Sequence, residues 1–280
     1  MKKNVICFIH IERAGGTSLH YLLQNSYFTY LSLKPWDIWT NTKSSEFSLS
    51  NLKLLKLINP FLNGFGGHTT RSYLEYETLF DKKLFYFTFV REPISRYMSH
   101  FNYQYQVMNI KWNINDFIND ERFNNFQTKR IAGESNLEKA KEQLRTKFNF
   151  VGMTEFYNES LLILKELLGN KKFKINYEKK NEIKHKQNLL LFDSFKEEQK
   201  KNIIANNEID IELYKYVKNE LFPQYQKKYT GNLQSDTINF VKSNKIFQYS
   251  KFKLILMFFY RSIHRIIIEP LIQYLSTKNM

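Results

Sequence analysis

The clearest signal in the chain is a set of short, nearly continuous apolar runs. Val5–Ile11 (VICFIHI) and Leu84–Val90 (LFYFTFV) contain almost no polar residues. Runs of this kind are typical of strands that are buried on both faces of a sheet. Phe148–Gly152 (FNFVG) is a third, shorter candidate. The pattern therefore predicts at least three buried strands.

Each run is followed by a turn and a segment whose apolar residues recur at helical spacing. These segments predict helices over Thr17–Gln24, from near Pro93 and over Glu159–Leu168, and proline suits the first turn of a helix. The same pattern predicts a mostly helical insertion over residues 104–147 and two more helices over residues 195–221. Strands that alternate with helices indicate an α/β fold with a central parallel sheet flanked by helices.

The character of the chain changes after Gly231. We expect one main domain over residues 1–230, and over residues 231–280 a polar linker followed by a basic, apolar tail. Within the tail, Phe252–Leu275 predicts an amphipathic helix that either lies in a membrane interface or packs on the main domain. We find no uncharged apolar run of about 18 residues and no signal peptide. The expected location is cytoplasmic, with the tail as an optional peripheral membrane contact.

The chain is strongly basic. Its 280 residues include 42 Lys or Arg and 27 Asp or Glu, which gives a formal net charge of +15. This charge predicts attraction to an anionic partner, whether nucleotide, acidic polysaccharide, nucleic acid or membrane, without choosing among them. At 42% apolar residues the chain is too hydrophobic to be disordered. A single cysteine, Cys7, excludes a disulfide framework and a multi-cysteine metal site.

The first candidate site is His10–Leu19 (HIERAGGTSL), where a predicted strand runs into a Gly-Gly turn and a helix start. A turn of this kind lets backbone N–H groups converge on an anion at a helix N-terminus. Thr17 and Ser18 add hydroxyl donors, and Arg13 adds a permanently charged, planar guanidinium. The segment is not a Walker A motif. Taken alone, it is equally typical of a plain tight turn.

The second candidate site is Val90–His100 (VREPISRYMSH). Arg91 follows a buried strand directly, at the sheet edge where open α/β folds bind their ligands. Ser99 lies about two turns into the next helix. Arg91, Arg96 and Ser99 are all suited to meet a phosphate. On spacing alone, a solvated helix face with a surface arginine is the better explanation.

Together, the two segments resemble the nucleotide-binding loops of sulfotransferases that use 3'-phosphoadenosine-5'-phosphosulfate (PAPS). The similarity is to the branch that contains heparan sulfate 2-O-sulfotransferase and related carbohydrate enzymes. Further matches to motifs of that branch follow in chain order, at Gly67-His68, Asn125–Gly133, Val151–Glu155, Glu159–Leu161 and Asp210–Tyr214. The resemblance covers roughly residues 5–225. One departure is Glu12-Arg13, where the family has Pro-Lys.

The resemblance implies a P-loop-NTPase-like sulfotransferase fold over residues 1–230. It also implies PAPS as co-substrate, no metal, no nucleic-acid partner and a carbohydrate hydroxyl as acceptor. By this similarity the first loop holds the 5'-phosphosulfate, and Arg91 and Ser99 hold the 3'-phosphate. The loop residues so implied are Arg13, Ala14, Gly15, Gly16, Thr17 and Ser18. The sequence leaves the acceptor's identity and the oligomeric state open.

Sulfuryl transfer is an in-line displacement, similar in geometry to phosphoryl transfer. The acceptor hydroxyl must lose a proton, and histidine suits that task near neutral pH. Because the family match puts His68 on the acceptor side, we predict His68 as the base and Arg13 as the cation that stabilises the leaving phosphate. We expect His10 to be a structural residue within the first strand. Glu12 and then His100 are the next candidates for the base.

Several weaker candidates complete the predicted site. Gln127, Thr128 and Arg130 are placed to touch nucleotide or acceptor. In related enzymes a loop near residues 179–186 closes over the nucleotide, and the basic residues here are Lys179, Lys180, Lys184 and Lys186. A solvated lysine-rich segment explains any single one of these lysines better.

Two other functions remain open at the level of sequence. A nucleotide-dependent phosphotransferase would use the same loop, but the Walker lysine and a clear Mg²⁺-binding aspartate after a strand are missing. A non-enzymatic basic protein that docks on an anionic membrane or nucleic acid would explain the charge and the tail. It would not explain the ordered motifs.

Overall fold

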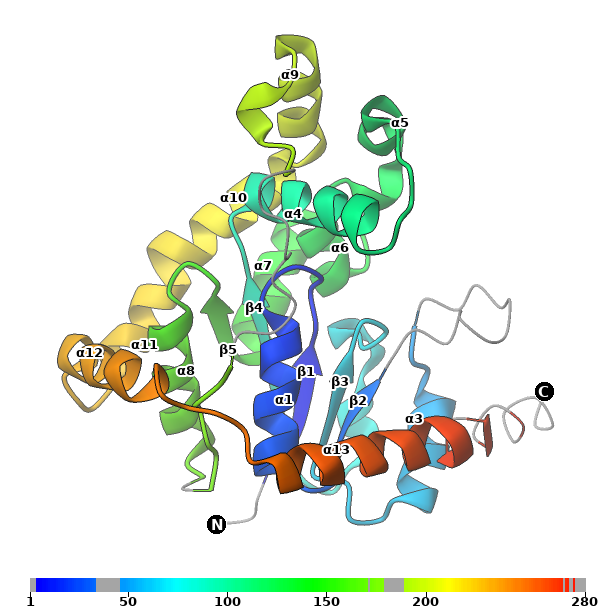
Figure 1. Cartoon of the computed structure of the whole chain (residues 1–280), viewed down its shortest axis with the longest axis vertical. Helices are drawn as coiled ribbons and strands as arrows, with labels where there is room; N and C mark the ends of the chain where they lie inside the picture. The colour runs from blue at the N-terminus through cyan, green and yellow to red at the C-terminus, as the bar shows by residue number, and fades with distance from the viewer. Residues whose placement is uncertain are drawn as a thin grey trace.

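A five-stranded parallel sheet forms the centre of the computed structural model, which describes residues 4–33, 46–170, 172–178, 189–268, 270–271 and 274. The sheet has the strand order β2-β3-β1-β4-β5, and every pairing is parallel. The strands are β1 (Val5–Ile9), β2 (Tyr30–Leu33), β3 (Gly64–Gly67), β4 (Leu84–Val90) and β5 (Phe148–Met153). The predicted α/β class, with a central parallel sheet flanked by helices, is confirmed (Figure 1).

The helices fall close to the segments expected from helical spacing. The predicted helices near residues 17, 93 and 159, the helical insertion and the pair after residue 195 are all present. The α-helices of the described residues are α1 (Gly16–Ser26), α3 (Leu49–Ile58), α4 (Pro93–Gln106), α5 (Ile114–Asn119), α6 (Phe126–Ala132), α7 (Leu137–Thr146), α8 (Tyr157–Leu168), α9 (Glu197–Asn206), α10 (Glu208–Tyr216), α11 (Phe222–Lys228), α12 (Leu233–Asn244) and α13 (Lys251–Ile263).

Strand register brings the candidate segments to one edge of the sheet. Ile9, the last residue of β1, lies opposite Gly67 in β3 and Thr88 in β4. The chain after β1, the residue after β3 and the residue after β4 therefore leave the sheet at the same edge. After β1 the chain continues to β2, at one edge of the sheet, and after β4 it continues to β5, at the other edge. Open α/β folds bind ligands at the point where the strand order reverses in this way.

Strands β2 and β3 were not predicted from the sequence, and β1 is shorter than expected. In β3 (GFGG) three of the four residues are glycine, which is not a strand-forming composition. Close packing requires it, because a Cβ at Gly66 would lie 2.5 Å from the carbonyl oxygen of Phe8. The four-residue β2 is too short to show a pattern. Since β1 ends at Ile9, His10 lies just beyond the strand rather than within it, which corrects that prediction.

The C-terminal segment is helical and contacts the main core. The stretch expected as a polar linker contains α12, whose Phe240 is buried in the same core cluster as the sheet. Helix α13 then crosses the C-terminal end of α1, along the lower edge of the molecule in Figure 1. Among the described helices, none has both the length and the apolar character that a membrane crossing requires.

Candidate functional site

A cavity of about 740 Å³ opens at the carboxyl edge of the sheet, where the loop after β1 meets the ends of β4 and β5. Its volume lies in the range of cavities that hold small ligands, about 300–1,000 Å³. The lining residues are His10, Arg13, Gly15, Gly16, Thr17, Ser18, Arg91, Ser95, Thr154, Glu155, Tyr157, Asn158 and Tyr177. Six of the predicted site residues are among them: Arg13, Gly15, Gly16, Thr17, Ser18 and Arg91.

The loop between β1 and α1 has the backbone geometry of an anion-binding turn. Gly15 adopts a left-handed conformation (φ 78°) and stands at the N-cap of α1, where no side chain caps the helix. Gly16 begins the helix, and a Cβ there would lie 2.0 Å from Nε2 of His10. Both glycines are therefore required by the local geometry. The helix start faces the cavity with Thr17 and Ser18 beside it, as anion binding at a helix N-terminus requires.

Arg13 is held in an unusual conformation at the cavity wall. Its backbone is left-handed (φ 67°), which is uncommon for a residue other than glycine. The Arg13 guanidinium lies 4.4 Å from the centre of the Tyr103 ring, and its Nε donates a hydrogen bond to Oγ of Ser99 at 3.0 Å. Burial, together with nearby Arg91, lowers the pKa of Arg13. A cation held this way is fixed before any ligand arrives.

Ser99 is therefore placed differently from the expectation. Its hydroxyl accepts from Arg13, and Ser99 is not among the residues that line the cavity. Ser95, one turn earlier in α4, lines the cavity instead. Ala14 is buried (1% exposed) and also lies outside the lining. The sequence match could not distinguish Ser95 from Ser99, since both lie on the same helix.

Arg91 is fixed at the cavity by its backbone. Gln127 accepts from the backbone N–H of Arg91 at 3.0 Å and donates to its carbonyl oxygen at 2.8 Å. The guanidinium of Arg91 in turn donates to the carbonyl oxygen of Arg13 at 3.2 Å, which joins the two candidate segments. Gln127 thus acts on the backbone of Arg91 and is not itself part of the cavity lining.

Two of the matched segments, Asn125–Gly133 and Asp210–Tyr214, cap the start of each other's helix. The carboxylate of Asp210 accepts from the backbone N–H groups of Gln127 and Thr128 at 2.9 and 2.8 Å and from the Thr128 hydroxyl at 2.7 Å. In return, Oδ1 of Asn125 accepts from the backbone N–H groups of Ile209 and Asp210 at 3.0 and 3.2 Å. Thr128 is therefore a structural contact of Asp210. The segment holds Gln127 in place against Arg91.

The third matched segment closes the cavity from β5. Thr154 donates from its backbone N–H and its hydroxyl to the carbonyl oxygen of Val90, each at 2.9 Å. Glu155 accepts from the backbone N–H of Glu92 at 2.8 Å. These contacts bring the ends of β4 and β5 together around Arg91. Thr154 and Glu155 were not singled out as site residues, although their position after a buried strand is the same signal that identified Arg91.

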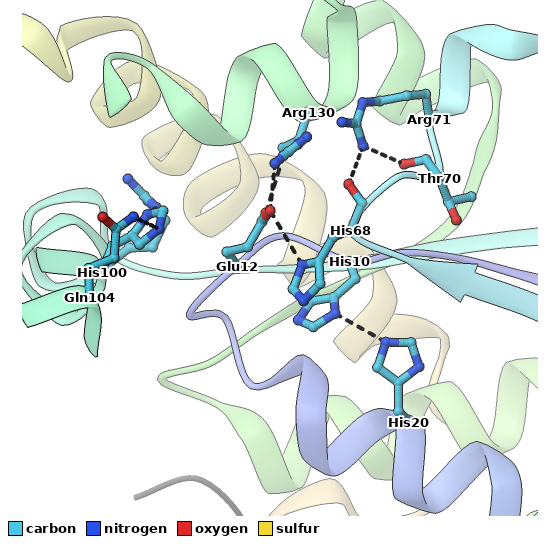
Figure 2. A network of polar contacts seen from close by, with 10 residues as sticks. His10, Glu12, His20, His68, Thr70, Arg71, His100, Gln104 and Arg130 are labelled. Carbon is cyan, nitrogen blue, oxygen red and sulfur yellow. Dashed lines mark hydrogen bonds and ion pairs between the residues drawn. The ribbon is translucent and has the colours of Figure 1, made fainter. Parts of the chain in front are cut away.

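His68 lies beside the cavity and carries an acidic partner. Nδ1 of His68 is 3.3 Å from Oε1 of Glu12, and the same carboxylate accepts two hydrogen bonds from Arg130, at 3.1 and 2.5 Å (Figure 2). Burial alone would raise the pKa of Glu12, but Arg130 and His68 outweigh burial and hold it well below the usual range. The carboxylate is thus ionised, and Arg130 is a partner of Glu12.

The His68 ring connects to the cavity through His10. The two rings stack with centres 4.1 Å apart, and His10 lines the cavity whereas His68 does not. Nδ1 of His10 lies 3.1 Å from Nε2 of His20, whose Nδ1 lies 2.8 Å from the Tyr30 hydroxyl. Burial and the two neighbouring imidazoles lower the pKa of His10 well below 6.5, so His10 is neutral. Sequence reasoning missed this part of the site, because it placed His10 inside a strand.

His100 lies apart from this group, within the interior (Figure 2). It is buried at 9% exposure, and its Nδ1 accepts from Nη1 of Arg96 at 3.2 Å. Burial and Arg96 lower its pKa to about 3. A neutral, enclosed imidazole that already binds an arginine is poorly placed to accept a proton from a ligand.

The last candidates from the sequence are the four lysines of residues 179–186. Lys179, Lys180, Lys184 and Lys186 lie outside the described residues. Within the described residues, no group of three or more His, Cys, Asp or Glu side chains is arranged to hold a metal ion.

The comparisons with known proteins add no family. No protein-family model matches the chain, and a search of curated proteins finds no matching sequence.

Proposed function

We propose that this protein is a PAPS-dependent sulfotransferase with a P-loop-like sulfotransferase fold, which moves a sulfuryl group to a carbohydrate hydroxyl. One observation carries the proposal. The loop after β1 and Arg91 after β4, which resemble the two phosphate-binding segments of that family, line a single cavity at the switch point of the sheet. Three of the other matched segments, Asn125–Gly133, Val151–Glu155 and Asp210–Tyr214, contribute contacts that hold Arg91 there.

The cavity suits an anionic nucleotide. Its lining offers two arginines, the N-terminus of α1 and the hydroxyls of Thr17 and Ser18, all of which favour phosphate groups. Arg91 and Ser95 would hold the 3'-phosphate, and residues 13–18 would hold the phosphosulfate. The aromatic rings of Tyr157 and Tyr177 line the same cavity and offer surfaces for a base.

In this proposal, different residues act on the leaving group and on the acceptor hydroxyl. Arg13 stabilises negative charge as it builds on the leaving phosphate. His68 takes the proton from the acceptor hydroxyl, and Glu12 orients the imidazole from Nδ1. His10 separates the His68 ring from the nucleotide cavity and stays neutral, so it adds no charge between donor and acceptor.

Ligand-dependent thermal unfolding tests the donor assignment directly. Adenosine 3',5'-bisphosphate should raise the melting temperature, because a ligand that binds only the folded state stabilises it. Arg91→Ala should weaken PAPS by about tenfold or more, the effect of losing one charge-assisted contact. Its effect on adenosine 5'-phosphosulfate, which lacks the 3'-phosphate, should be much smaller. Equal weakening of both ligands would remove Arg91 from the 3'-phosphate.

Activity is tested separately with labelled PAPS and a panel of carbohydrate acceptors. Transfer of label to a hydroxyl of one acceptor, dependent on Arg13, would support the reaction. Stabilisation by ATP with Mg²⁺ but not by adenosine 3',5'-bisphosphate would favour a phosphotransferase instead.

A further inference from the structure

Helix α13 and the π-helical turn that continues it (His264–Ile268) expose a row of apolar residues on the side that faces away from the protein. Phe252, Ile255, Phe259, Ile263 and Ile266 follow the three- and four-residue spacing of one helix face. They are exposed by 68%, 52%, 58%, 51% and 71%, respectively. A surface helix of a globular protein has the reverse arrangement, with polar residues outward.

The opposite side of the helix is already occupied by the protein. Met257 and His264 are buried, and Lys253 donates to Oδ1 of Asn25 in α1 at 2.9 Å. The Tyr260 ring lies 5.7 Å from the ring of Phe28, a residue just after α1 that is itself 75% exposed. The helix is therefore docked by one side, and its outward apolar face is left without a partner among the described residues.

The charged residues in this part of the sequence have one sign. Between Asp236 and Glu269 the chain has no acidic residue, and it has six basic ones: Lys242, Lys245, Lys251, Lys253, Arg261 and Arg265. Lys242, Lys245 and Lys251 are exposed on α12, on the connection and at the start of α13. An exposed apolar face within a stretch of sequence whose charges are all basic fits the boundary between acyl chains and anionic headgroups.

We propose that the exposed face of α13 inserts into the interface of an anionic lipid membrane and holds the protein there. A second copy of the chain is a poorer occupant, because pairing two such faces would bring two segments of the same positive charge together. The cavity lies at the N-terminal end of α1 and α13 at its C-terminal end, so the attached protein would keep the cavity turned away from lipid (Figure 1).

Vesicle sedimentation of the full chain tests the proposal. It should bind vesicles of equal parts phosphatidylcholine and phosphatidylserine, and bind vesicles of phosphatidylcholine alone far more weakly. Phe252→Ser with Phe259→Ser should lower binding about tenfold or more, because apolar burial and charge act together. The matched control, Leu191→Ser with Ile204→Ser, removes two exposed apolar residues outside α13 and should bind as wild type does.

A second readout separates insertion from simple charge attraction. In Phe259→Trp, anionic vesicles should shift the indole emission to shorter wavelength relative to wild type, whereas Ile204→Trp should show no such shift. Equal vesicle binding by wild type and by the Phe252→Ser, Phe259→Ser variant would overturn the proposal. A concentration-dependent dimer of the wild type, seen by sedimentation velocity and abolished in that variant, would overturn it too. Neither measurement uses nucleotide or turnover, so failure here leaves the proposed function untouched.

Discussion

Glu12 and His68 meet at the carboxyl edge of neighbouring strands, with Oε1 of Glu12 3.3 Å from Nδ1 of His68. Parallel pairing of β1 and β3 creates this contact, since each residue follows the end of its strand. Arg130 holds the carboxylate from the other side with two hydrogen bonds. The residue that departs from the family pattern therefore lies against the proposed base, and we expect it to orient the imidazole.

Replacing Glu12 with glutamine should lower turnover. Oε1 of Glu12 lies 3.3 Å from Nδ1 of His68 and Arg130 holds the carboxylate there, so its loss should leave the imidazole less well oriented and reduce kcat, measured from initial rates with PAPS, about tenfold or more. Glu134→Gln, which removes an exposed carboxylate paired with Lys139, should leave kcat unchanged. An unchanged kcat in Glu12→Gln would contradict the orienting role.

The same variant has a stability signature with a defined sign. The pKa of Glu12 is lower in the folded protein, so its ion pairs stabilise the fold above the ordinary carboxyl pKa and are lost as pH falls through the lowered value. The free energy of unfolding of Glu12→Gln, from urea titrations, should therefore fall furthest below wild type near neutral pH. The difference should shrink below pH about 4.

His68→Ala should reduce turnover by about 10²–10⁴-fold, the usual effect of removing a general base. Donor binding should stay close to wild type, because His68 does not line the cavity and His10 lies between. Calorimetry with adenosine 3',5'-bisphosphate and initial rates with PAPS measure the two quantities independently. Near-normal turnover would move the role of base to Glu12.

Ser95 and Ser99 should give opposite phenotypes. Ser95 lines the cavity, so Ser95→Ala should weaken adenosine 3',5'-bisphosphate with little change in kcat. Ser99 accepts from Arg13, so Ser99→Ala should lower kcat more than it weakens the ligand. Titrations and initial rates on both variants provide the comparison. If Ser99→Ala alone weakens the ligand, the original assignment of Ser99 to the 3'-phosphate is restored.

Arg13→Ala should abolish most turnover and keep the fold, since the site loses its fixed cation at the leaving group. Arg13→Lys keeps a charge but loses the planar contact with Tyr103 and the Nε hydrogen bond to Ser99. We expect the lysine variant to retain more activity than the alanine variant, measured as kcat with saturating PAPS. Wild-type turnover in Arg13→Ala would limit the loop to binding.

Local patterns were enough to predict the strands that are apolar throughout, such as β4, and the helices that follow them. They failed at β3, whose glycines are explained by the atoms of Ile6, Phe8 and Leu33 packed against them on the neighbouring strands. The proximity of Arg13 to Ser99, and of Glu12 to Arg130, depends on long-range pairing and had no local signal. The resemblance of the ordered motifs singled out the loop and Arg91, whereas only the folded structure shows that Ser95 rather than Ser99 lines the cavity.

The caps between α6 and α10 show how strongly the site depends on contacts far from the cavity. Asp210 is fully buried and accepts three hydrogen bonds from Gln127 and Thr128. An asparagine in its place would turn an N–H₂ group toward backbone N–H donors. Asp210→Asn should therefore lower the free energy of unfolding by about 1–3 kcal/mol, the cost of leaving buried groups unsatisfied.

The same substitution should also affect ligand binding, because Gln127 would no longer hold the backbone of Arg91. We expect Asp210→Asn to weaken adenosine 3',5'-bisphosphate at a temperature where the variant is still folded. Glu212→Gln, on the same helix, breaks only an exposed pair with Lys215 and should change the free energy of unfolding by no more than about 0.5 kcal/mol. Normal ligand affinity in a destabilised Asp210→Asn would show that Arg91 keeps its place without Gln127.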